Sequence, residues 1–245
     1  PRLHSLLVLV ITLSMAITPL LVMLMARLCK AKEQPHEVPP EYREIDSDAP
    51  RVVIAGMGRM GQMVARVLRA QRVPFIALDT EVDAIELSRS LGKMPIFYGD
   101  PLRPEILHAA KVEQAEYFIV ATDDPQTCLA ISELVRRLYP HIKIIARARN
   151  RQHVHRLLDA GALPIRETFH SSLEMSRQTL IGLGLNEEQA NLRIKRFQRH
   201  DEDVLEAQHR VYNDKAAVLQ TAREARAELE TLFDADSSET SNPQR

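Results

Sequence analysis

The feature that most constrains the fold of this chain is the stretch Arg51–Asp79. A short apolar run, Val52–Ala55, is typical of a buried parallel strand, and it leads directly into the motif Gly56–Gly61, which reads Gly-Met-Gly-Arg-Met-Gly. A helix-period pattern follows, and a second apolar run, Phe75–Leu78, ends in Asp79. This order of strand, glycine turn, helix, strand and acid indicates a nucleotide-binding βαβ unit.

Each glycine has its own physical role in such a unit. Gly56 permits the tight turn, Gly58 lets the backbone approach a pyrophosphate, and Gly61 lets the helix pack closely on the strand. The helix N-terminus offers free N–H groups and the positive end of its dipole to phosphates. Asp79 lies 18 residues beyond Gly61, where such folds place the carboxylate that binds a ribose hydroxyl. The cofactor-binding residues predicted from this stretch are Gly56, Gly58, Arg59, Met60, Gly61 and Asp79. The alternative is a glycine turn that serves packing alone.

Beyond this unit, strand-like and helix-like segments alternate regularly. We expect strands at Val52–Ala55, Phe75–Leu78, Met94–Tyr98, Tyr117–Ala121 and Ile142–Ala146, with a short sixth near Leu163–Ile165. We expect helices at Gly58–Ala70, Val82–Leu91, Pro104–Ala110, Pro125–Leu138, Arg151–Ala160 and Ser171–Leu183. This alternation predicts an α/β fold, a doubly wound parallel sheet of the Rossmann type with strand order 3-2-1-4-5-6. The sheet domain is assigned to residues 51–168.

The N-terminal part of the chain has a different composition from the predicted sheet domain. Ser5–Ala26 is 22 residues without a charge, long enough at about 1.5 Å per residue to cross a membrane. Arg27, Lys30 and Lys32 follow at once, so the positive-inside rule puts the residues after about 27 in the cytoplasm. Residues 1–29 are therefore predicted to contain one transmembrane helix, the alternative being a buried core helix. The proline-rich residues 30–50 are predicted to be a linker. The chain begins with Pro1, which suggests a piece of a longer polypeptide.

The C-terminal part lacks strand signals. Residues 169–234 are predicted to form a helical arm, with Asn186–Phe233 almost entirely helical. A valine, alanine or leucine recurs every seven residues from Val204 to Leu232, but the second apolar position of the heptad is poorly kept, so the coiled-coil signal is weak. An amphipathic arm that lies on a globular body is the preferred interpretation. The polar residues 235–245 are expected to be a disordered tail.

Acidic residues at strand ends are the further candidates for nucleotide binding. Asp79, Asp100 and Asp123 follow the second, third and fourth strands, and ligands of open α/β sheets bind at the carboxyl ends of the strands. For Asp123 and Asp124 helix capping is the competing interpretation. No arginine accompanies Thr80-Glu81, which disfavours a 2′-phosphate. The pattern therefore favours NAD(H) or an adenosine nucleotide such as AMP over NADP.

Composition excludes several function classes. The net charge of −1 gives no reason to expect nucleic-acid binding. Cys29 and Cys128 are far apart and form no disulfide or metal pattern. Four histidines, His108, His141, His153 and His155, have no fixed partner in sequence and are expected at the surface or at helix ends. No substrate domain follows the sheet, so the chain is predicted not to be an enzyme.

Five segments, in this order along the chain, carry a resemblance to a known family: Arg51–Gln62, Phe97–Asp100, Asp123–Thr127, Pro140–Arg149 and Arg166–Phe169. Together they closely resemble the C-terminal regulatory region, a KTN or RCK-like domain, of the glutathione-gated potassium-efflux systems of Gram-negative bacteria, the KefB and KefC type. The tail Arg223–Phe233 is more similar to KefB. The resemblance runs from the membrane helix to about Phe233.

The resemblance implies a function and several partners. The upstream part would be a potassium:proton antiporter of the bacterial inner membrane. The soluble part would be a homodimer that binds a nucleotide, is held closed by glutathione and is opened by glutathione S-adducts. A flavodoxin-like quinone-oxidoreductase subunit would dock on it.

The resemblance also implies a second set of site residues. By position, Arg66 and Arg166 match arginines that bind glutathione, and Leu91 stands where a phenylalanine meets the bulky adduct. Asp201 stands where an asparagine contacts glutathione in KefC. A carboxylate facing an anionic tripeptide is unfavourable, although sequences of the KefB type share the acid. The predicted glutathione-binding residues are Arg66, Leu91, Arg166 and Asp201.

Two other interpretations stay open at this point. One is a membrane-anchored NAD(H)-dependent oxidoreductase, which would need a catalytic histidine or cysteine beside the nicotinamide. The other is a TrkA-type regulatory subunit of potassium uptake, a class that is peripheral and lacks the membrane helix.

Overall fold

The computed structural model describes residues 8, 11–15, 17–19, 21, 23, 49–90 and 94–240, without the side chains of 88 and 232–240. The chain divides into two units, Pro1–Arg43 and Glu44–Arg245. Half of the predicted membrane helix Ser5–Ala26, and the linker up to residue 48, lie outside the described residues. Within the part that is described, no helix is both long enough and apolar enough to span a membrane.

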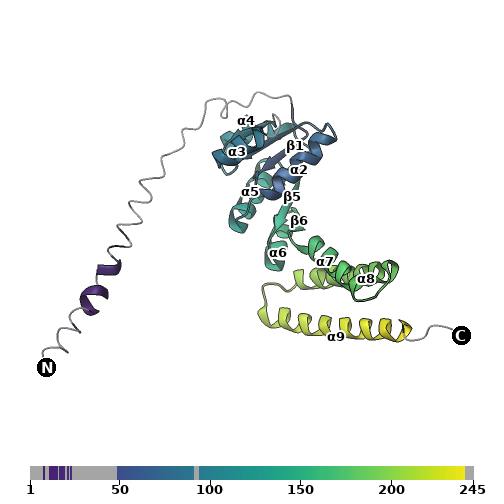
Figure 1. The fold of residues 1–245 in the computed structure, drawn as a ribbon. Helices are drawn as coiled ribbons and strands as arrows, with labels where there is room; N and C mark the ends of the chain where they lie inside the picture. Colours follow the sequence, from purple (N-terminus) through teal and green to yellow (C-terminus); the bar gives the residue numbers. More distant parts are fainter. Residues whose placement is uncertain are drawn as a thin grey trace. The chain divides into compact units, whose positions relative to one another are not determined.

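A six-stranded parallel sheet forms the centre of the second unit, with strand order β3-β2-β1-β4-β5-β6 (Figure 1). The strands are β1 (Val52–Ala55), β2 (Phe75–Asp79), β3 (Ile96–Tyr98), β4 (Tyr117–Val120), β5 (Lys143–Ala148) and β6 (Leu163–Arg166). The predicted fold class and strand order are confirmed. β5 extends two residues beyond its expected end, because Arg147 and Ala148 pair with Ile165 and Arg166 of the edge strand β6.

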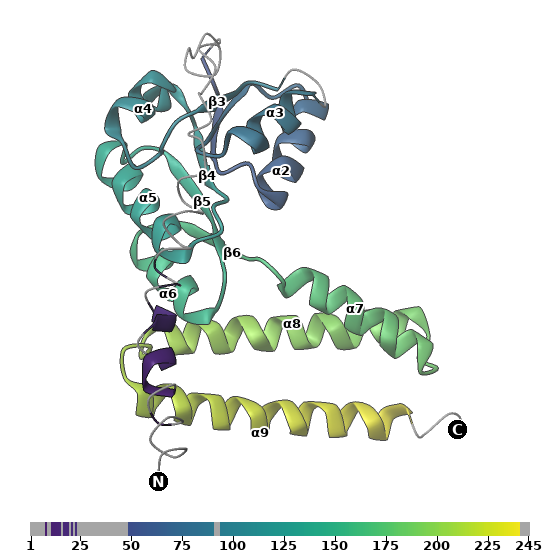
Figure 2. The ribbon, with the colours of Figure 1, turned by 60° about the vertical axis from the view of Figure 1, so that its left-hand side comes forward.

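Helices cover both faces of this sheet. α2 (Arg59–Ala70) and α3 (Val82–Ser90) lie on one face, and α4 (Pro104–Ala109), α5 (Pro125–Leu138) and α6 (Arg151–Asp159) lie on the other (Figure 2). A short 3₁₀ helix, η2 (Val112–Gln114), precedes β4. This arrangement follows from the right-handed crossover of parallel strands, which changes face where the strand order reverses at β1.

The core is built from the apolar runs that the sequence shows. All four residues of β1 are buried, and Val53, Ile76 and Phe118 are completely inaccessible. A strand buried on both faces needs a continuous apolar run rather than an alternating one. The glycine motif follows β1 at the carboxyl edge of the sheet, next to the ends of β2 and β4.

The arm consists of three helices, α7 (Phe169–Gly182), α8 (Glu187–His209) and α9 (Lys215–Thr240). α7 contacts α8, and α8 contacts α9, which runs back alongside it (Figure 2). The expectation of one nearly continuous helix from Asn186 to Phe233 is therefore wrong at Arg210–Asp214, where the chain turns. Asn186 forms a capping box at the start of α8, and the Asp214 carboxylate accepts from the N–H of Ala216 at 2.9 Å at the start of α9.

Two further expectations about the arm are not met. Val211, one of the residues of the seven-residue repeat, lies in the turn, so the repeat does not describe one continuous helix. The helix α9 continues to Thr240, whereas the sequence led us to expect disorder from residue 235. Two residues of the repeat, Val204 of α8 and Ala225 of α9, line the same cavity inside the α8–α9 hairpin.

Candidate functional site: a glycine-loop pocket and a buried arginine–aspartate cluster

The three glycines of the motif occupy three different environments. Gly56 has a φ of +96°, and a Cβ on it would lie 2.9 Å from the backbone nitrogen of Thr122. A Cβ on Gly61 would lie 2.0 Å from the carbonyl oxygen of Gly56. A Cβ on Gly58 would meet nothing within 4 Å. Gly56 and Gly61 are therefore required by the fold, whereas the space beside Gly58 is open for a ligand.

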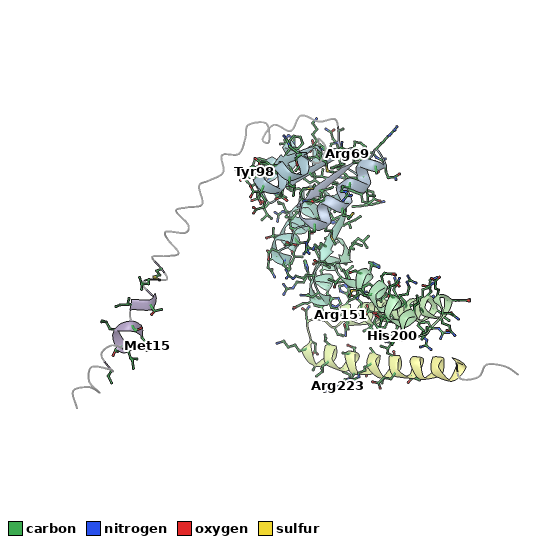
Figure 3. The ribbon with its side chains drawn as sticks, in the orientation of Figure 1. Met15, Arg69, Tyr98, Arg151, His200 and Arg223 are labelled. Carbon is green, nitrogen blue, oxygen red and sulfur yellow. The ribbon has the colours of Figure 1, made fainter. Side chains whose placement is uncertain are left out.

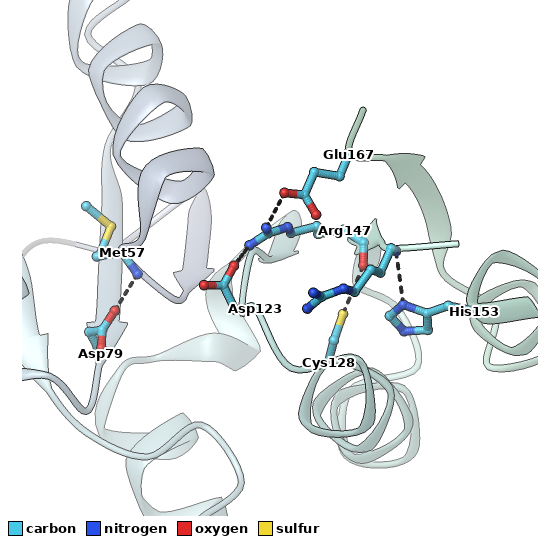
Figure 4. Close-up of polar contacts among 8 residues, drawn as sticks. Met57, Asp79, Asp123, Cys128, Arg147, His153 and Glu167 are labelled. Carbon is cyan, nitrogen blue, oxygen red and sulfur yellow. Dashed lines mark hydrogen bonds and ion pairs between the residues drawn. The ribbon is translucent and has the colours of Figure 1, made fainter. Parts of the chain in front are cut away.

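Asp79 joins the end of β2 to the glycine loop. Its Oδ2 atom accepts a 2.5 Å hydrogen bond from the Met57 N–H (Figure 4), and its Oδ1 atom accepts from the Glu81 N–H at 2.8 Å. These two bonds fix the carboxylate at the carboxyl edge of the sheet, where a ribose hydroxyl of a bound nucleotide would lie.

A pocket of about 410 Å³ lies at this edge. It brings together five of the predicted cofactor-binding residues: Gly56, Gly58, Asp79, Asp100 and Asp123. The other three, Arg59, Met60 and Gly61, form the first turn of α2 and do not line the pocket. Free N–H groups of that first turn are available to a phosphate, because Gly58 makes no side-chain cap.

Asp123 and Asp124 have separate roles. Asp124 caps α5 by accepting from the N–H of Thr127 at 2.8 Å, so the capping interpretation holds for it. Asp123 forms an ion pair with Arg147, whose guanidinium also donates to Glu167 Oε1 at 2.5 Å (Figure 4). Burial lowers the pKa of Arg147, but its hydrogen bonds to Glu167 and Asp123 outweigh this, and the pKa is raised. This network holds Asp123 at the rim of the pocket.

Thr122 lies between the glycine loop and the pocket. Its backbone packs against Gly56, and the residue lines the pocket. Its hydroxyl oxygen is buried without an oxygen or nitrogen partner among the described residues, with the Cys128 thiol as its neighbour. Buried polar atoms in native proteins are normally hydrogen-bonded, and the Cys128 thiol is the group beside this oxygen that can serve it.

A second cluster lies where the arm meets the sheet domain. Asp201, from the middle of α8, forms ion pairs with Arg151 at the start of α6 and Arg166 at the end of β6. The Asp201 side chain is only 9% exposed. The Arg166 guanidinium carbon lies 3.4 Å from the centre of the Phe169 ring, so its planar face is covered as well.

The residues predicted to bind glutathione are only partly brought together. Arg166 and Asp201 are in direct contact, which their separation in sequence did not predict. Arg66 is exposed on α2 and does not line the nucleotide pocket. Leu91 lies outside the described residues.

Sequence reasoning missed several contributors to these two sites. Thr122 has no motif of its own in the sequence. Glu167 lies within the segment Arg166–Phe169, and Arg151 belongs to the run of arginines Arg147, Arg149 and Arg151 after the fifth strand, but nothing in the sequence identified the partner of either. His153 and His155 are buried, at 5% and 3% exposure, so neither lies at the surface; His153 does lie at a helix end, in the first turn of α6. The ring of His155 stacks on His209 and on Tyr212, residues from the far end of α8 and the following turn. Among the described residues, no group of three or more histidine, cysteine or acidic side chains is arranged to hold a metal ion.

Comparison with known proteins agrees with this architecture. The TrkA-N domain family model matches residues 52–166, and the model of the potassium efflux system KefB C-terminal domain matches residues 171–245. The boundary between the two matches falls where the sheet domain ends and the arm begins.

Individual relatives give the same assignment. The glutathione-regulated potassium-efflux system protein KefC of Salmonella arizonae is 39% identical over 100% of this chain, and that of Cronobacter sakazakii is 40% identical over 98% of it. The chain spans 39% and 38% of the length of these two relatives. The Kef C-terminal domain of Shewanella denitrificans, solved in an AMP-bound form, is 35% identical with a TM-score of 0.60, over 65% of this chain and 98% of that one. The chain therefore belongs to the family of C-terminal regulatory regions, with a KTN or RCK-like fold, of the KefB and KefC type of potassium-efflux system.

Proposed function

We propose that this chain is the ligand-sensing gate of a glutathione-regulated potassium:proton antiporter in a bacterial inner membrane. The sheet domain binds an adenine nucleotide, NAD(H) or AMP, in the glycine-loop pocket. Glutathione holds the gate closed through Arg66 and Arg166, and glutathione S-adducts open it. The single observation that carries the proposal is the pocket that gathers Gly56, Gly58, Asp79, Asp100 and Asp123 in a chain of the Kef family.

The chemistry of the two sites supports separate ligands. The glycine-loop pocket offers backbone N–H groups for phosphate and carboxylates for ribose, which suits a nucleotide. The cluster at the arm offers guanidinium groups, which bind carboxylates in a two-bond fork, and glutathione carries two carboxylates. The Shewanella relative was solved with AMP, which supports the nucleotide assignment here.

Thermodynamic linkage explains how glutathione S-adducts would open the gate. A ligand shifts a gate only by its differential affinity for the two states. Glutathione and its S-adducts share the same carboxylates, so the S-substituent must make the difference. Leu91 is the residue that we assign to sense it.

The proposal includes the assembly of the whole transporter. The gate acts as a homodimer, joined through residues 1–29 to the antiporter domain, with residues after about 27 in the cytoplasm. A flavodoxin-like quinone-oxidoreductase subunit docks on it as an ancillary partner.

Calorimetric titration of the chain with AMP, NADH, glutathione and an S-alkyl glutathione tests the proposal. We expect AMP and NADH to compete with each other, and glutathione to bind whether or not a nucleotide is present. Competition of glutathione with AMP for one site would contradict the two-site arrangement. Oxidation of NADH by a quinone, catalysed by the isolated chain, would instead favour the oxidoreductase alternative.

A further inference from the structure

Asp201 is an unusual residue in the arm. It lies in the middle of α8, yet its side chain is almost completely buried, and its two carboxylate oxygens pair with different arginines. Arg151 is 42% exposed and Arg166 is 16% exposed, and both belong to the sheet domain. Arg151 also donates to Gln208 Oε1 of α8 at 3.2 Å. One carboxylate shared by two guanidinium groups is thus a central polar contact between α8 and the sheet domain.

Stability alone does not explain this arrangement. Removing charged groups from water costs free energy that their attraction only partly returns, and apolar replacements of buried ion pairs are often as stable or more stable. A carboxylate held by guanidinium groups does, however, reproduce the contact that a ligand carboxylate would make with the same arginines. Asp201 therefore occupies the position of an anionic ligand.

The structure provides room for such a ligand beside Asp201. A cavity of about 330 Å³ is lined by Arg151, Asp201 and Gln208 on its polar side and by Phe197, Val204 and Leu229 on its apolar side. Arg151 comes from α6 of the sheet domain, whereas His200, which also lines the cavity, comes from α8 of the arm (Figure 3). A ligand in this cavity lies beside Asp201 and Arg151, and it reaches Arg166 once Asp201 is displaced.

We propose that Asp201 is a built-in competitor for the carboxylate of the regulatory ligand. With α8 docked, Asp201 occupies Arg151 and Arg166. A ligand carboxylate that binds these arginines displaces Asp201 and loosens α8 from the sheet domain. The inference rests on the proposed function, because it takes the ligand to be glutathione or one of its S-adducts.

Competition has two measurable consequences. The apparent affinity for the ligand is proportional to the fraction of molecules whose arginines are not occupied by Asp201. Ligand binding and the docking of α8 must also weaken each other reciprocally. Removing the charge of Asp201 should therefore strengthen ligand binding, and it should loosen α8 even without ligand.

The test is calorimetric titration of glutathione into the full chain and into Asp201→Asn and Asp203→Asn. Asp203 is exposed on the same helix, so its variant makes the same change in net charge away from the arginines. We expect Asp201→Asn to bind glutathione about tenfold more tightly, equivalent to ~1.4 kcal/mol, and Asp203→Asn to bind as the unsubstituted chain does. AMP affinity, unchanged in all three proteins, reports that the sheet domain is folded.

Amide hydrogen exchange of the unsubstituted chain gives a second measurement that needs no variant. Saturating glutathione should speed exchange in α8, and Asp201→Asn should show this faster exchange without ligand. Equal or weaker glutathione binding by Asp201→Asn, or slower exchange of α8 with glutathione bound, would overturn the inference and leave the proposed function standing. No glutathione binding by any of the three proteins would overturn both.

Discussion

The Met57 N–H donates a 2.5 Å hydrogen bond to Asp79, so the glycine loop after β1 and the acid that ends β2 form one unit before any ligand binds. The carboxylate is held in place by this bond and by the Glu81 N–H. A site whose groups are already positioned loses less conformational entropy when a ligand binds.

We therefore expect Asp79→Ala to weaken AMP and NADH binding. The ribose hydroxyls lose a charged acceptor, which is worth about 1.5–3 kcal/mol, and the loop loses its tie to β2. Isothermal titration measures the change. Glu81→Gln, which alters another acid that lines the pocket, is the matched control and should bind nearly as before. Unchanged affinity of Asp79→Ala for both nucleotides would refute the role of Asp79.

The glycine motif offers a matched pair of variants. Gly61→Ala places a Cβ 2.0 Å from a backbone carbonyl oxygen, so we expect it to destabilise the fold by about 1–3 kcal/mol or more. Gly58→Ala meets no atom within 4 Å, so stability should change by less than about 0.5 kcal/mol. Nucleotide affinity should nevertheless fall, because the new methyl group occupies space open to the ligand. Urea denaturation and AMP titration separate the two effects.

Arg166→Lys tests the guanidinium at the arm. Lysine keeps the charge but cannot form the two-bond fork or cover Phe169 in the same way. We expect glutathione and its S-adducts to bind about tenfold more weakly, ~1.4 kcal/mol, while AMP and NADH affinities stay the same. Cells that carry the variant in the whole transporter should lose K⁺ without electrophile. A variant that binds glutathione normally, or that loses nucleotide instead, would contradict the two-site arrangement.

Much of this architecture was predictable, because it depends on local sequence. The strand order followed from apolar runs, each about one strand long, and from a glycine motif whose geometry permits few alternatives. The turn at Arg210–Asp214 escaped prediction, because Val211 continues the apolar repeat and no glycine or proline interrupts it. The only signal was Asn213-Asp214, a pair that favours helix caps.

Contacts between distant segments were not predictable in the same way. The pairing of Arg166 with Asp201 joins the end of a strand to the middle of a helix, and no local pattern encodes it. The burial of His155 likewise depends on Tyr212, which covers it from the turn after α8. The resemblance to the Kef family pointed to Arg166 and Asp201 but not to their mutual contact.

Burial of His155 predicts a dependence of stability on pH. Burial lowers the pKa of His155, as do His209 and Arg151, and Asp159 acts in the opposite direction. The folded state thus binds fewer protons than the unfolded state. The stability carried by neutral His155 is full above the unfolded-state pKa of about 6.5 and is lost as pH falls toward the lower folded-state pKa.

Urea denaturation at a series of pH values around and below 6.5 measures this loss. His155→Gln should flatten the dependence. His108→Gln, which alters a side chain that is 82% exposed, should leave it as it is. An identical pH profile for His155→Gln and the unsubstituted chain would show that another group is responsible.

Exposed apolar side chains on the arm predict self-association. Met175 is 72% exposed and Leu183 is 76% exposed, and Met175 borders an apolar cavity of about 450 Å³ between α7 and α8. We expect the chain to sediment as a dimer at tens of micromolar, roughly where an interface of ~1,600 Å² holds. Met175→Asp should shift it toward monomer, whereas Leu219→Asp on α9 should not. A monomer at that concentration would refute the expected homodimer.

The edge strand β6 has a consequence for how a second chain can approach. Glu167 donates its N–H to the Ala148 carbonyl of β5 at 3.0 Å. Backbone N–H groups of successive residues in a strand point to opposite sides, so the nitrogen of Pro164, three residues earlier, points away from β5. Proline has no N–H, so the open side of β6 lacks the donor that an added strand would need there. The sheet is thereby protected from growing by strand addition. A subunit that reaches this edge must pack against the side chains of Leu163 and Ile165 instead.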